Sequence, residues 1–509
     1  MSEQHSPVYW IDTCSPPQFP QLEGEIDVDV AIIGGGIVGA SAARFLKDQG
    51  MTVALVEARR VGQGVSGKAT AKVTSQHGIT YQTIEKKFGE DRARLYAEAQ
   101  ETGLRKIIEL SRAHGFDADI EPMPAFVYTR EERHVEEIEK EVEIAQKLGL
   151  PASLTRDTGL PFDVLSAMRW ENQAQFHPLK YVAGLAATIP GEGSQVFENS
   201  RVTDWDPHSI STGRGKVRAR HVVMATNLPL GQVGLYYATN YAMAEPVVAA
   251  PISRVPPAFY KNVEQPGHSI RTHRHNGRTY AIAAGSHFKP GHVEEEQKYL
   301  ADIERWLGEH FGAEKIEYRW VNEDYSPMDG APFIGWSSSG TDDAYLVATG
   351  FNAWGFTNGT AAGMIIADLA AGRDNAWVDL FDARRVKPLA GAREFVKENA
   401  SVAAHLIGGY TSRKPNSYDE LRPGEAAILK VDGDNVAAFR DEQGEIHAVS
   451  AACSHMGCLL GWNATDRTWD CPCHGSRFAL SGEVLHGPAV TALKPAKNEA
   501  REDLQSETR

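Results

Sequence analysis

Apolar runs and helix-like segments alternate near the start of the chain. Residues 27–33 form an almost continuous apolar stretch, which is followed by a glycine-rich turn at 34–39 and by a helical pattern over 40–47. A second apolar stretch covers residues 52–57. Strands of this kind are buried on both faces, as in parallel sheets covered by helices. The pattern therefore predicts a strand–helix–strand unit in an α/β fold.

The pattern changes farther along the chain. Residues 83–150 are rich in Glu, Lys and Arg at helical spacing and predict amphipathic helices, whereas alternation around residues 279–285 predicts antiparallel strands. Buried-type strands return at 220–226 and 345–350, before a helical pattern at 358–371. We therefore expect a discontinuous Rossmann-like α/β domain into which a second, α+β domain is inserted.

Toward the C-terminus the chain has the pattern of a small all-β domain. Residues 426–431 and 435–440 are short strand-like segments punctuated by Asp-Gly and Gln-Gly turns. A looser stretch rich in Lys, Pro, Asn and Ser precedes them. The predicted division is an α/β domain at 1–385 (its Rossmann-like parts at about 27–80, 195–228 and 325–375), a linker at 386–416, a β domain at 417–498 and a tail at 499–509.

Length and composition agree with several globular domains. The chain has 509 residues, of which 42% are hydrophobic and 23% charged, and a chain of this length exceeds one ordinary core. No apolar run approaches the roughly 20 residues of a membrane-spanning helix. The N-terminus has no pattern of an export signal. These features predict a cytoplasmic protein without a transmembrane segment.

Charge and cysteine usage narrow the class further. The formal net charge of −15 is spread along the chain, which argues against nucleic acid as a partner. Cys14 stands alone, whereas the other four of the five cysteines fall between Cys453 and Cys473. A tight group of cysteines in a cytoplasmic protein indicates a metal or redox site.

Two short motifs bring cysteine and histidine together: Cys453-Ser-His455-Met-Gly-Cys458 and Cys471-Pro-Cys473-His474-Gly-Ser476. Two Cys-His pairs on separate loops can hold two irons, with thiolates on one and imidazoles on the other, which is the Rieske ligand set. The same residue types could bind zinc. A zinc finger, however, places its Cys pair on one arm and its His pair on the other. The spacing favours a Rieske-type [2Fe–2S] cluster.

Residues 415–495 resemble the Rieske family. The resemblance implies that one iron is bound by Cys453 and Cys471 and the other by His455 and His474, and that the loops are joined by a Cys458–Cys473 disulfide. Ring-hydroxylating oxygenases generally lack this disulfide, so the pattern is like the respiratory-chain branch.

Two further residues bear on the potential of the expected cluster. Ser476 resembles the serine that donates a hydrogen bond to a bridging sulfide and raises the potential. Phe478 stands where high-potential members have a tyrosine whose hydroxyl bonds a ligand sulfur. The resemblance therefore implies a potential below that of the high-potential members.

The glycine-rich turn indicates a dinucleotide site. A Gly-x-Gly-x-x-Gly pattern alone is weak evidence, but here a strand precedes it, a helix follows it, and Glu57 ends the next strand. Such a turn brings backbone N–H groups to a pyrophosphate, and the acidic residue can bind ribose hydroxyls. This leaves FAD and NAD as alternatives.

Further motifs resemble the D-amino-acid oxidase-like superfamily, which includes glycine and sarcosine oxidases. They are found at residues 62–67, 202, 224–226, 329–335 and 350–357. The resemblance implies FAD contacts at Gly34, Gly36, Gly39, Glu57, Gly64, Ser66, Gly67, Val202, Ala225, Thr226, Gly350, Phe351, Gly355, Phe356 and Thr357.

We expect the FAD to be bound without a covalent link. Relatives that attach FAD through the loop equivalent to residues 66–72 carry a histidine there, and this chain has none. His77 lies farther along, and a hydrogen-bonded structural histidine is the favoured interpretation.

The same resemblance implies oxidation of a C–H bond next to an amine, by hydride transfer to FAD, leaving an imine that hydrolyses. Few catalytic residues follow from sequence because the cofactor carries the chemistry. Weak candidates for contacts with an amine or amino-acid-like substrate are Arg271, His273, Tyr280, Asn352 and Trp354. For each of them alone, a structural role is the more common one.

Three functions compete. In the preferred one, the substrate reduces FAD and electrons pass through the cluster to an external acceptor. In the second, the cluster feeds an oxygenase iron, but the chain shows no clear Asp-x-x-His-x-x-x-His run for such a site. In the third, a non-catalytic carrier is reduced by NAD(P)H, for which a second Gly-x-Gly-x-x-Gly is usual and is missing here. Because the two sites are predicted in separate domains, we expect them to lose their cofactors independently.

Overall fold

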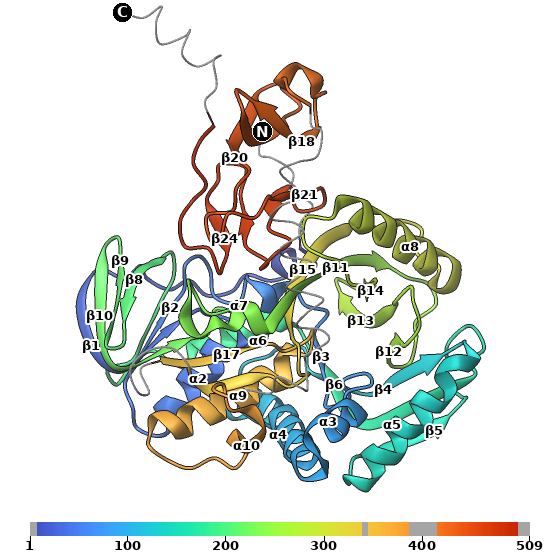
Figure 1. Cartoon of the computed structure of the whole chain (residues 1–509). Helices are drawn as coiled ribbons and strands as arrows, with labels where there is room; N and C mark the ends of the chain where they lie inside the picture. Colours follow the sequence, from blue (N-terminus) through green and yellow to red (C-terminus); the bar gives the residue numbers. More distant parts are fainter. Residues whose placement is uncertain (1–7, 338–344, 386–414, 497–509) are drawn as a thin grey trace, which may run out of the picture.

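A mostly parallel sheet forms the centre of the first domain (Figure 1). The computed structural model describes residues 8–337, 345–385 and 415–496. The central sheet has the order β16-β17-β10-β1-β2-β7, with β8 and β9 added beside β10. Its strands are β1 (Gly24–Ile33), β2 (Val53–Val56), β7 (Gln195–Phe197), β8 (Val202–Asp206), β9 (Ser209–Thr212), β10 (Gly215–Met224), β16 (Phe333–Trp336) and β17 (Tyr345–Thr349).

Helices cover this sheet because its inner strands are apolar on both faces. The end of β1 is fully buried, and β1 pairs in parallel with β10 and β2. Helix α2 packs against α9 so closely that a Cβ on Gly363 would lie 2.7 Å from the Cβ of Ser41. The helices of the described residues are α1 (Tyr9–Asp12), α2 (Ile37–Asp48), α3 (Tyr81–Phe88), α4 (Glu90–His114), α5 (Val135–Lys147), α6 (Pro178–Ala187), α7 (Tyr236–Thr239), α8 (Val293–Phe311), α9 (Gly355–Ala370) and α10 (Val378–Phe381).

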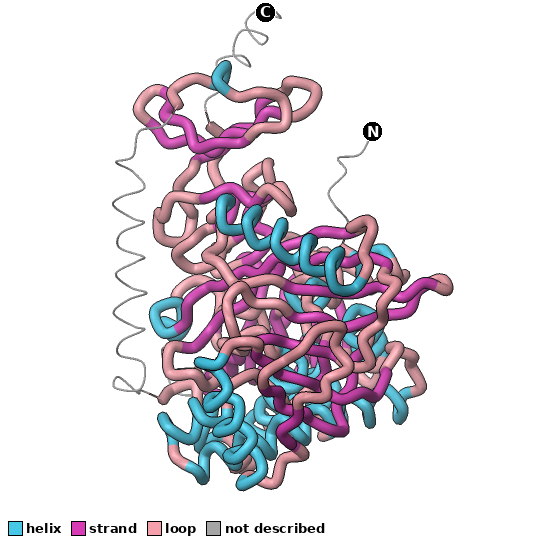
Figure 2. Tube along the Cα trace, turned by 90° about the vertical axis from the view of Figure 1, so that its right-hand side faces the viewer, coloured by secondary structure: helices cyan, strands magenta, loops and turns pink. Residues whose placement is uncertain are grey.

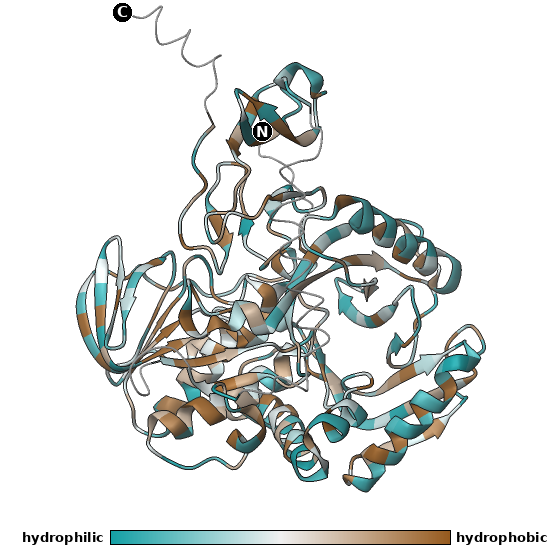
Figure 3. Ribbon diagram, viewed as in Figure 1, coloured by the Kyte–Doolittle hydropathy of each residue, from teal (hydrophilic) through white to brown (hydrophobic). Residues whose placement is uncertain are grey.

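A second sheet builds the inserted α+β domain. Its order is β15-β11-β14-β13-β12-β4-β6-β3, with β5 beside β6. The apolar side of helix α8 packs on one face of this sheet. The rest of the helix is largely hydrophilic (Figure 3). The strands are β3 (Lys72–Val73), β4 (Glu121–Thr129), β5 (Ala152–Thr155), β6 (Ser166–Gln175), β11 (Asn240–Pro251), β12 (Phe259–Asn262), β13 (Ser269–His275), β14 (Arg278–Ala284) and β15 (Tyr318–Pro327).

The C-terminal part forms a separate all-β domain that stands on the larger body (Figure 2). It contains a three-stranded and a four-stranded sheet. The four-stranded sheet lies toward the larger body and the three-stranded sheet away from it (Figure 1). The strands are β18 (Ala426–Val431), β19 (Asp434–Arg440), β20 (Ile446–Ser450), β21 (Gly461–Asn463), β22 (Thr468–Asp470), β23 (Arg477–Phe478) and β24 (Val484–His486).

The predicted fold class is confirmed, with one local error. The predicted helices over residues 83–150 are interrupted by β4, which pairs with β6 and β12. Pro122 and Pro124 exclude a helix there, and the aromatic and β-branched residues that follow favour a strand. Residues 386–414 of the predicted linker and the whole predicted tail lie outside the described residues.

No helix in the described parts of the chain has the length and apolar character needed to cross a bilayer.

Candidate functional site

A large cavity opens where the glycine-rich turn, the inserted domain and the C-terminal domain meet. Its empty volume, including the part that is open to solvent, is about 1460 Å³. Gly34 begins the turn with a φ of +107°, and a Cβ there would lie 2.5 Å from the carbonyl oxygen of Ala225. A Cβ on Gly39 would lie 1.9 Å from the oxygen of Gly34. Only glycine therefore allows this turn to lie against the adjacent strand end.

The second glycine loop is tied to the first. The hydroxyl of Ser66, in the short 3₁₀ helix η1 (Val65–Lys68), accepts a hydrogen bond of 3.0 Å from the backbone N–H of Ile37. This N–H belongs to the first turn of α2. The N–H groups at the start of that turn, and the positive end of its dipole, lie at the cavity, where they would bind an anionic group such as a pyrophosphate.

Glu57 lies at the other edge of the cavity. One of its carboxylate oxygens accepts from the N–H of Gly35 at 2.8 Å, and the other accepts from the N–H of Arg59 at 2.9 Å. Each oxygen keeps further lone pairs for ribose hydroxyls. Arg59 and Arg201 also line this end of the cavity.

The third element is the loop that opens α9. Asn352 and Ala353 have left-handed backbone conformations with φ of 51° and 65°. A carboxylate oxygen of Asp324 holds the N–H of Ala353 at 2.6 Å, and burial raises the pKa of this carboxyl to about 7. The loop thus places the N-terminus of α9, which begins at Gly355, at the cavity.

Most of the predicted FAD contacts come together in this cavity. Those that line it are Gly34, Gly36, Glu57, Gly64, Ser66, Val202, Ala225, Thr226, Phe351, Gly355 and Phe356. Outside the lining lie Gly39, Gly67, Gly350 and Thr357. Gly67 has a role in the fold of its own loop, because a Cβ on it would lie 2.3 Å from the oxygen of Gly62.

The arrangement fits FAD without a covalent link. The cavity is lined by an acidic residue that suits a ribose, by glycine turns at a helix N-terminus that suit a pyrophosphate, and by the N-terminus of a second helix. A dinucleotide needs the first two of these features next to each other. His77 is buried, does not line the cavity, and is hydrogen-bonded to the Tyr96 hydroxyl (2.6 Å) and the Thr74 carbonyl (2.8 Å). Burial lowers its pKa to about 3.

The weak substrate candidates lie in different places. Trp354 lines the cavity. Arg271 lies behind the cavity wall, where its guanidinium donates to the carbonyls of Ala71 and Phe176. His273 is hydrogen-bonded to Tyr9 and Asp119, the Tyr280 hydroxyl donates to Glu317, and Asn352 is exposed and accepts from Ser326. Of these five candidates, Trp354 is therefore the one that lies where a ligand in the cavity can contact it.

The cysteine–histidine loops form the second site. Cys453 and Cys471 are buried free thiols, and a hydrogen bond between them lowers the pKa of Cys453 to about 7. The Nδ1 atoms of both His455 and His474 are buried and have no hydrogen-bond partner among the described residues. Burial lowers the pKa of His474 to about 4, so that this imidazole is neutral.

This donor set fits a [2Fe–2S] cluster. Nε2 of His455 donates to the carbonyl of Gly231 at 3.3 Å, which fixes the proton on Nε2 and leaves the lone pair on Nδ1 for a metal. Two thiols and two unpaired imidazole nitrogens on facing loops match the Rieske ligand set.

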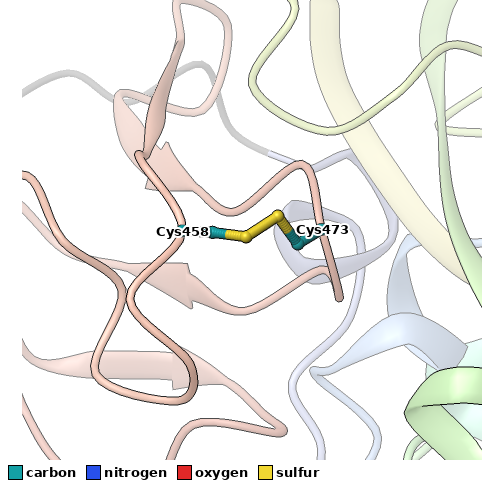
Figure 4. Close-up of a disulfide and its surroundings, with 2 residues drawn as sticks. All are labelled: Cys458 and Cys473. Carbon is teal, nitrogen blue, oxygen red and sulfur yellow. A yellow bond between two sulfur atoms is a disulfide. The ribbon is translucent and has the colours of Figure 1, made fainter. Parts of the chain in front are cut away.

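A disulfide joins the two loops, as expected from the Rieske resemblance. Cys458 and Cys473 are bonded to each other, with their Cα atoms 6.5 Å apart (Figure 4). These two cysteines are therefore not available as metal ligands. Cys14, which stands apart from the other cysteines in the sequence, is not in a disulfide.

Ser476 and Phe478 lie next to the loops. The side chain of Ser476 hydrogen-bonds the sulfur of Cys453 and accepts from the N–H of Ala489 at 3.0 Å. Phe478 is fully buried in the same apolar cluster as Cys453 and Cys471.

The histidine side of this site faces the larger body of the protein. The Tyr237 ring makes edge contacts with the rings of His455 and His474, at centroid distances of 5.4 and 5.2 Å. The hydroxyl of Tyr325 donates to the His474 carbonyl at 2.9 Å. A Cβ at residue 475 would lie 2.7 Å from that hydroxyl, which requires Gly475.

A buried charge network joins the two parts. Arg477 of β23 pairs with Asp470 (2.9 Å) and Asp466 (2.8 Å) in its own domain and with Glu323 of β15 (2.9 Å). Asp466 also pairs with Lys68 of the second glycine loop at 2.6 Å. Burial alone would lower the pKa of Arg477, but the surrounding carboxylates raise it, so that the guanidinium stays charged.

The C-terminal domain also forms part of the cavity wall. Leu485, His486 and Gly487 line the same cavity as the glycine turns. These residues were not among the predicted site residues, and neither were the lining residues Lys72, Glu245, Asn322 and Asp324. No local pattern marks them, because they come together only through the pairing of distant strands and the contact between domains.

Comparisons with known proteins agree with this geometry. The family model "FAD dependent oxidoreductase" (DAO) matches residues 29–369, and the model "Rieske [2Fe-2S] domain" matches residues 416–497. A Bacillus subtilis protein, YhfW, described as a Rieske 2Fe-2S iron-sulfur protein, is 34% identical over 96% of both chains. Gamma-glutamylputrescine oxidoreductase of Escherichia coli is 29% identical over 45% of this chain and 56% of its own.

Solved structures share the fold of the larger body. Glycine oxidase from Geobacillus kaustophilus aligns with a TM-score of 0.57 and 18% identity, over 71% of this chain and 100% of its own. L-proline dehydrogenase from P. horikoshii gives the same TM-score and identity, over 72% and 98%. The chain therefore belongs to the DAO family of FAD dependent oxidoreductases and carries a Rieske [2Fe–2S] domain, so that it is an oxidoreductase with both cofactors.

Proposed function

We propose that the protein oxidises the C–N bond of an amine or amino-acid-like substrate at the FAD site and passes the electrons through the Rieske cluster to an external acceptor. The observation that carries this proposal is the shared cavity wall. Leu485, His486 and Gly487 line the cavity beside the glycine turns, and they belong to the domain that holds the cluster loops. The cavity of the larger body thus lies against the domain that carries the cluster loops, within one chain.

The family and the names of similar proteins support the substrate class. Glycine oxidase, L-proline dehydrogenase and gamma-glutamylputrescine oxidoreductase are all named for amine or amino-acid compounds. FAD, when bound, supplies hydride acceptance from the carbon next to the amine, and the [2Fe–2S] cluster supplies one-electron transfer. Because oxidation of an amine releases two electrons and a cluster takes one, the acceptor has to collect electrons twice for each turnover.

Two neighbouring residues of β15 position the loops at the two sites. Asp324 fixes the loop before α9, whose first N–H groups stabilise negative charge that develops at the cavity. Tyr325, the next residue, holds the loop of His474. We assign the cluster ligands to Cys453, Cys471, His455 and His474, the oxidoreductase domain to residues 1–385, the linker to 386–416 and the Rieske domain to 417–498.

An anaerobic screen of amines and amino acids tests this function. The FAD absorbance of the purified holoprotein should bleach rapidly with at least one of these compounds, whereas NADH should bleach it only slowly. Rapid bleaching by NADH, with no response to any amine or amino acid, would contradict the proposal and favour an electron carrier.

A further inference from the structure

A histidine of the Rieske domain lies in the wall of the flavin cavity. His486, at the end of β24, lines the cavity together with its neighbours Leu485 and Gly487. Its Nε2 atom is buried and has no hydrogen-bond partner among the described residues. A buried nitrogen without a partner is uncommon in a folded protein, and at a cavity wall a bound ligand is the simplest source of one.

The larger body holds this segment in place before and after the histidine. The guanidinium of Arg201, which also lines the cavity, donates to the carbonyl of Val484 at 2.7 Å. The backbone N–H of Gly231 donates to the carbonyl of Pro488 at 3.2 Å. Both hydrogen bonds join the larger body to the Rieske domain. His486 is therefore fixed at the cavity by the contact between the two domains.

The imidazole ring of His486 is also packed against an aromatic residue. The ring of Tyr325 lies nearly parallel to it, with the centroids 6.3 Å apart and an angle of 22° between the planes. The hydroxyl of Tyr325 donates to the carbonyl of His474 and lies 3.4 Å from the carbonyl of Gly487. The tyrosine that holds a cluster loop thus also limits the movement of the histidine at the flavin cavity.

The surroundings of His486 favour a negatively charged ligand. Burial, together with the cations of Arg477, Arg59 and Lys68, lowers the pKa of its imidazole to about 3, so that the ring is neutral. Arg59 lies close in sequence to Glu57, the residue predicted to bind the ribose, and Lys68 belongs to the second glycine loop. A neutral imidazole keeps one N–H donor, which suits an oxygen that only accepts. The pyrophosphate is the part of FAD that is both anionic and rich in such oxygens.

We propose that His486 donates a hydrogen bond to the pyrophosphate of FAD, so that the Rieske domain supplies part of the flavin site. The inference goes beyond the proposed function, because it does not depend on which substrate is oxidised. The FAD contacts predicted from sequence end at Thr357, and the match to the FAD dependent oxidoreductase family model ends at residue 369. This contact lies outside both, and through it FAD is held by both domains of the chain.

The dissociation constant of FAD, measured by flavin fluorescence, tests the proposal without turnover. His486→Leu and His486→Phe both remove the ring nitrogens, and the second variant keeps an aromatic ring against Tyr325. Each should raise the dissociation constant about tenfold, because a hydrogen bond to a charged group is lost. His486→Gln keeps an N–H donor and should stay within about threefold of the wild type.

A histidine elsewhere in the same domain provides the matched control. His447 of β20 is half-buried, pairs with Asp441 at 3.1 Å and does not line the cavity. His447→Leu should therefore leave the dissociation constant of FAD unchanged. Iron and acid-labile sulfide contents establish that each variant keeps a folded Rieske domain.

The two halves of FAD locate the contact. Full-length protein depleted of FAD is titrated with ADP, which carries the pyrophosphate, and with riboflavin, which carries the flavin ring without phosphate. His486→Leu should weaken ADP binding about tenfold and leave riboflavin binding unchanged. Normal FAD affinity in the Leu and Phe variants, an equal loss of affinity in His486→Gln, or a loss for riboflavin rather than for ADP would overturn the proposal.

Discussion

The hydroxyl of Tyr325 donates a hydrogen bond of 2.9 Å to the backbone carbonyl of His474. Tyr325 follows Asp324 on β15, and Asp324 lines the flavin cavity. Successive side chains of a strand point to opposite faces. One strand of the inserted domain thus presents one residue to the flavin cavity and the next to a cluster loop, and this arrangement is the structural basis of the proposed electron route.

Removal of Arg477 should loosen the contact between the domains. Arg477→Met leaves Asp470 and Glu323 buried without their cation and Asp466 with Lys68 alone, which costs about 3–5 kcal/mol. We expect a clearly lower midpoint of thermal unfolding and a faster loss of FAD on dilution. Both are measured by the release of flavin fluorescence on heating and after dilution.

The matched control is an arginine in an exposed ion pair. Arg218, paired with Glu25, is about half exposed, so Arg218→Met should change stability by less than about 1 kcal/mol. If Arg477→Met behaves like this control, the charge network does not hold the domains together.

Cluster ligand variants should lose iron and also weaken flavin binding. Cys453→Ser or His474→Ala removes a ligand and should remove the cluster, with iron and acid-labile sulfide as the measured quantities. From sequence we expected the two sites to lose their cofactors independently. Because Leu485, His486 and Gly487 form part of the flavin cavity, we now predict that loss of the cluster also raises the dissociation constant for FAD.

Metal analysis of the wild-type protein, prepared anaerobically, decides the identity of this site. Two irons for each chain are expected from the Rieske ligand set. Zinc in place of iron would contradict the cluster assignment, and unchanged FAD affinity in a cluster-free variant would contradict the coupling.

Local motifs made the fold class and much of the two candidate sites predictable from sequence. The ligand residues Cys453, His455, Cys471 and His474 and the glycine turn occupy short contiguous segments, and their spacing alone restricts the chemistry. The α/β class followed in the same way from continuous apolar strands such as β1.

The parts of the site that the sequence did not predict depend on contacts between distant segments. Glu245 and Asn322 lie side by side because β11 and β15 pair with these two residues opposite each other. The local sequence of either strand does not predict this register. Arg271 was chosen by residue type, but its guanidinium is held by backbone carbonyls behind the cavity. The share of the cavity wall that comes from Leu485 to Gly487 depends on how two domains meet.

Introduction of a hydroxyl at Phe478 should raise the potential of the cluster. Phe478 is fully buried beside the cluster cysteines, and Phe478→Tyr can donate to a ligand sulfur, which favours the reduced cluster. A difference of about 1 kcal/mol corresponds to roughly 40 mV for one electron. Protein-film voltammetry measures this shift, and an unchanged or lower potential in a variant with an intact cluster spectrum would refute the hydrogen-bond account.

The central claim is that electrons taken from the substrate at the FAD site reach the Rieske cluster of the same chain. Anaerobic rapid mixing with a reducing amino acid, followed by optical absorbance and electron paramagnetic resonance of frozen samples, tests it most directly. The account predicts that FAD bleaches first, that the reduced-cluster signal follows at a rate independent of protein concentration, and that Cys453→Ser bleaches without this signal. Full bleaching of FAD in the wild type with no reduced-cluster signal, or with one whose rate depends on protein concentration, would contradict it.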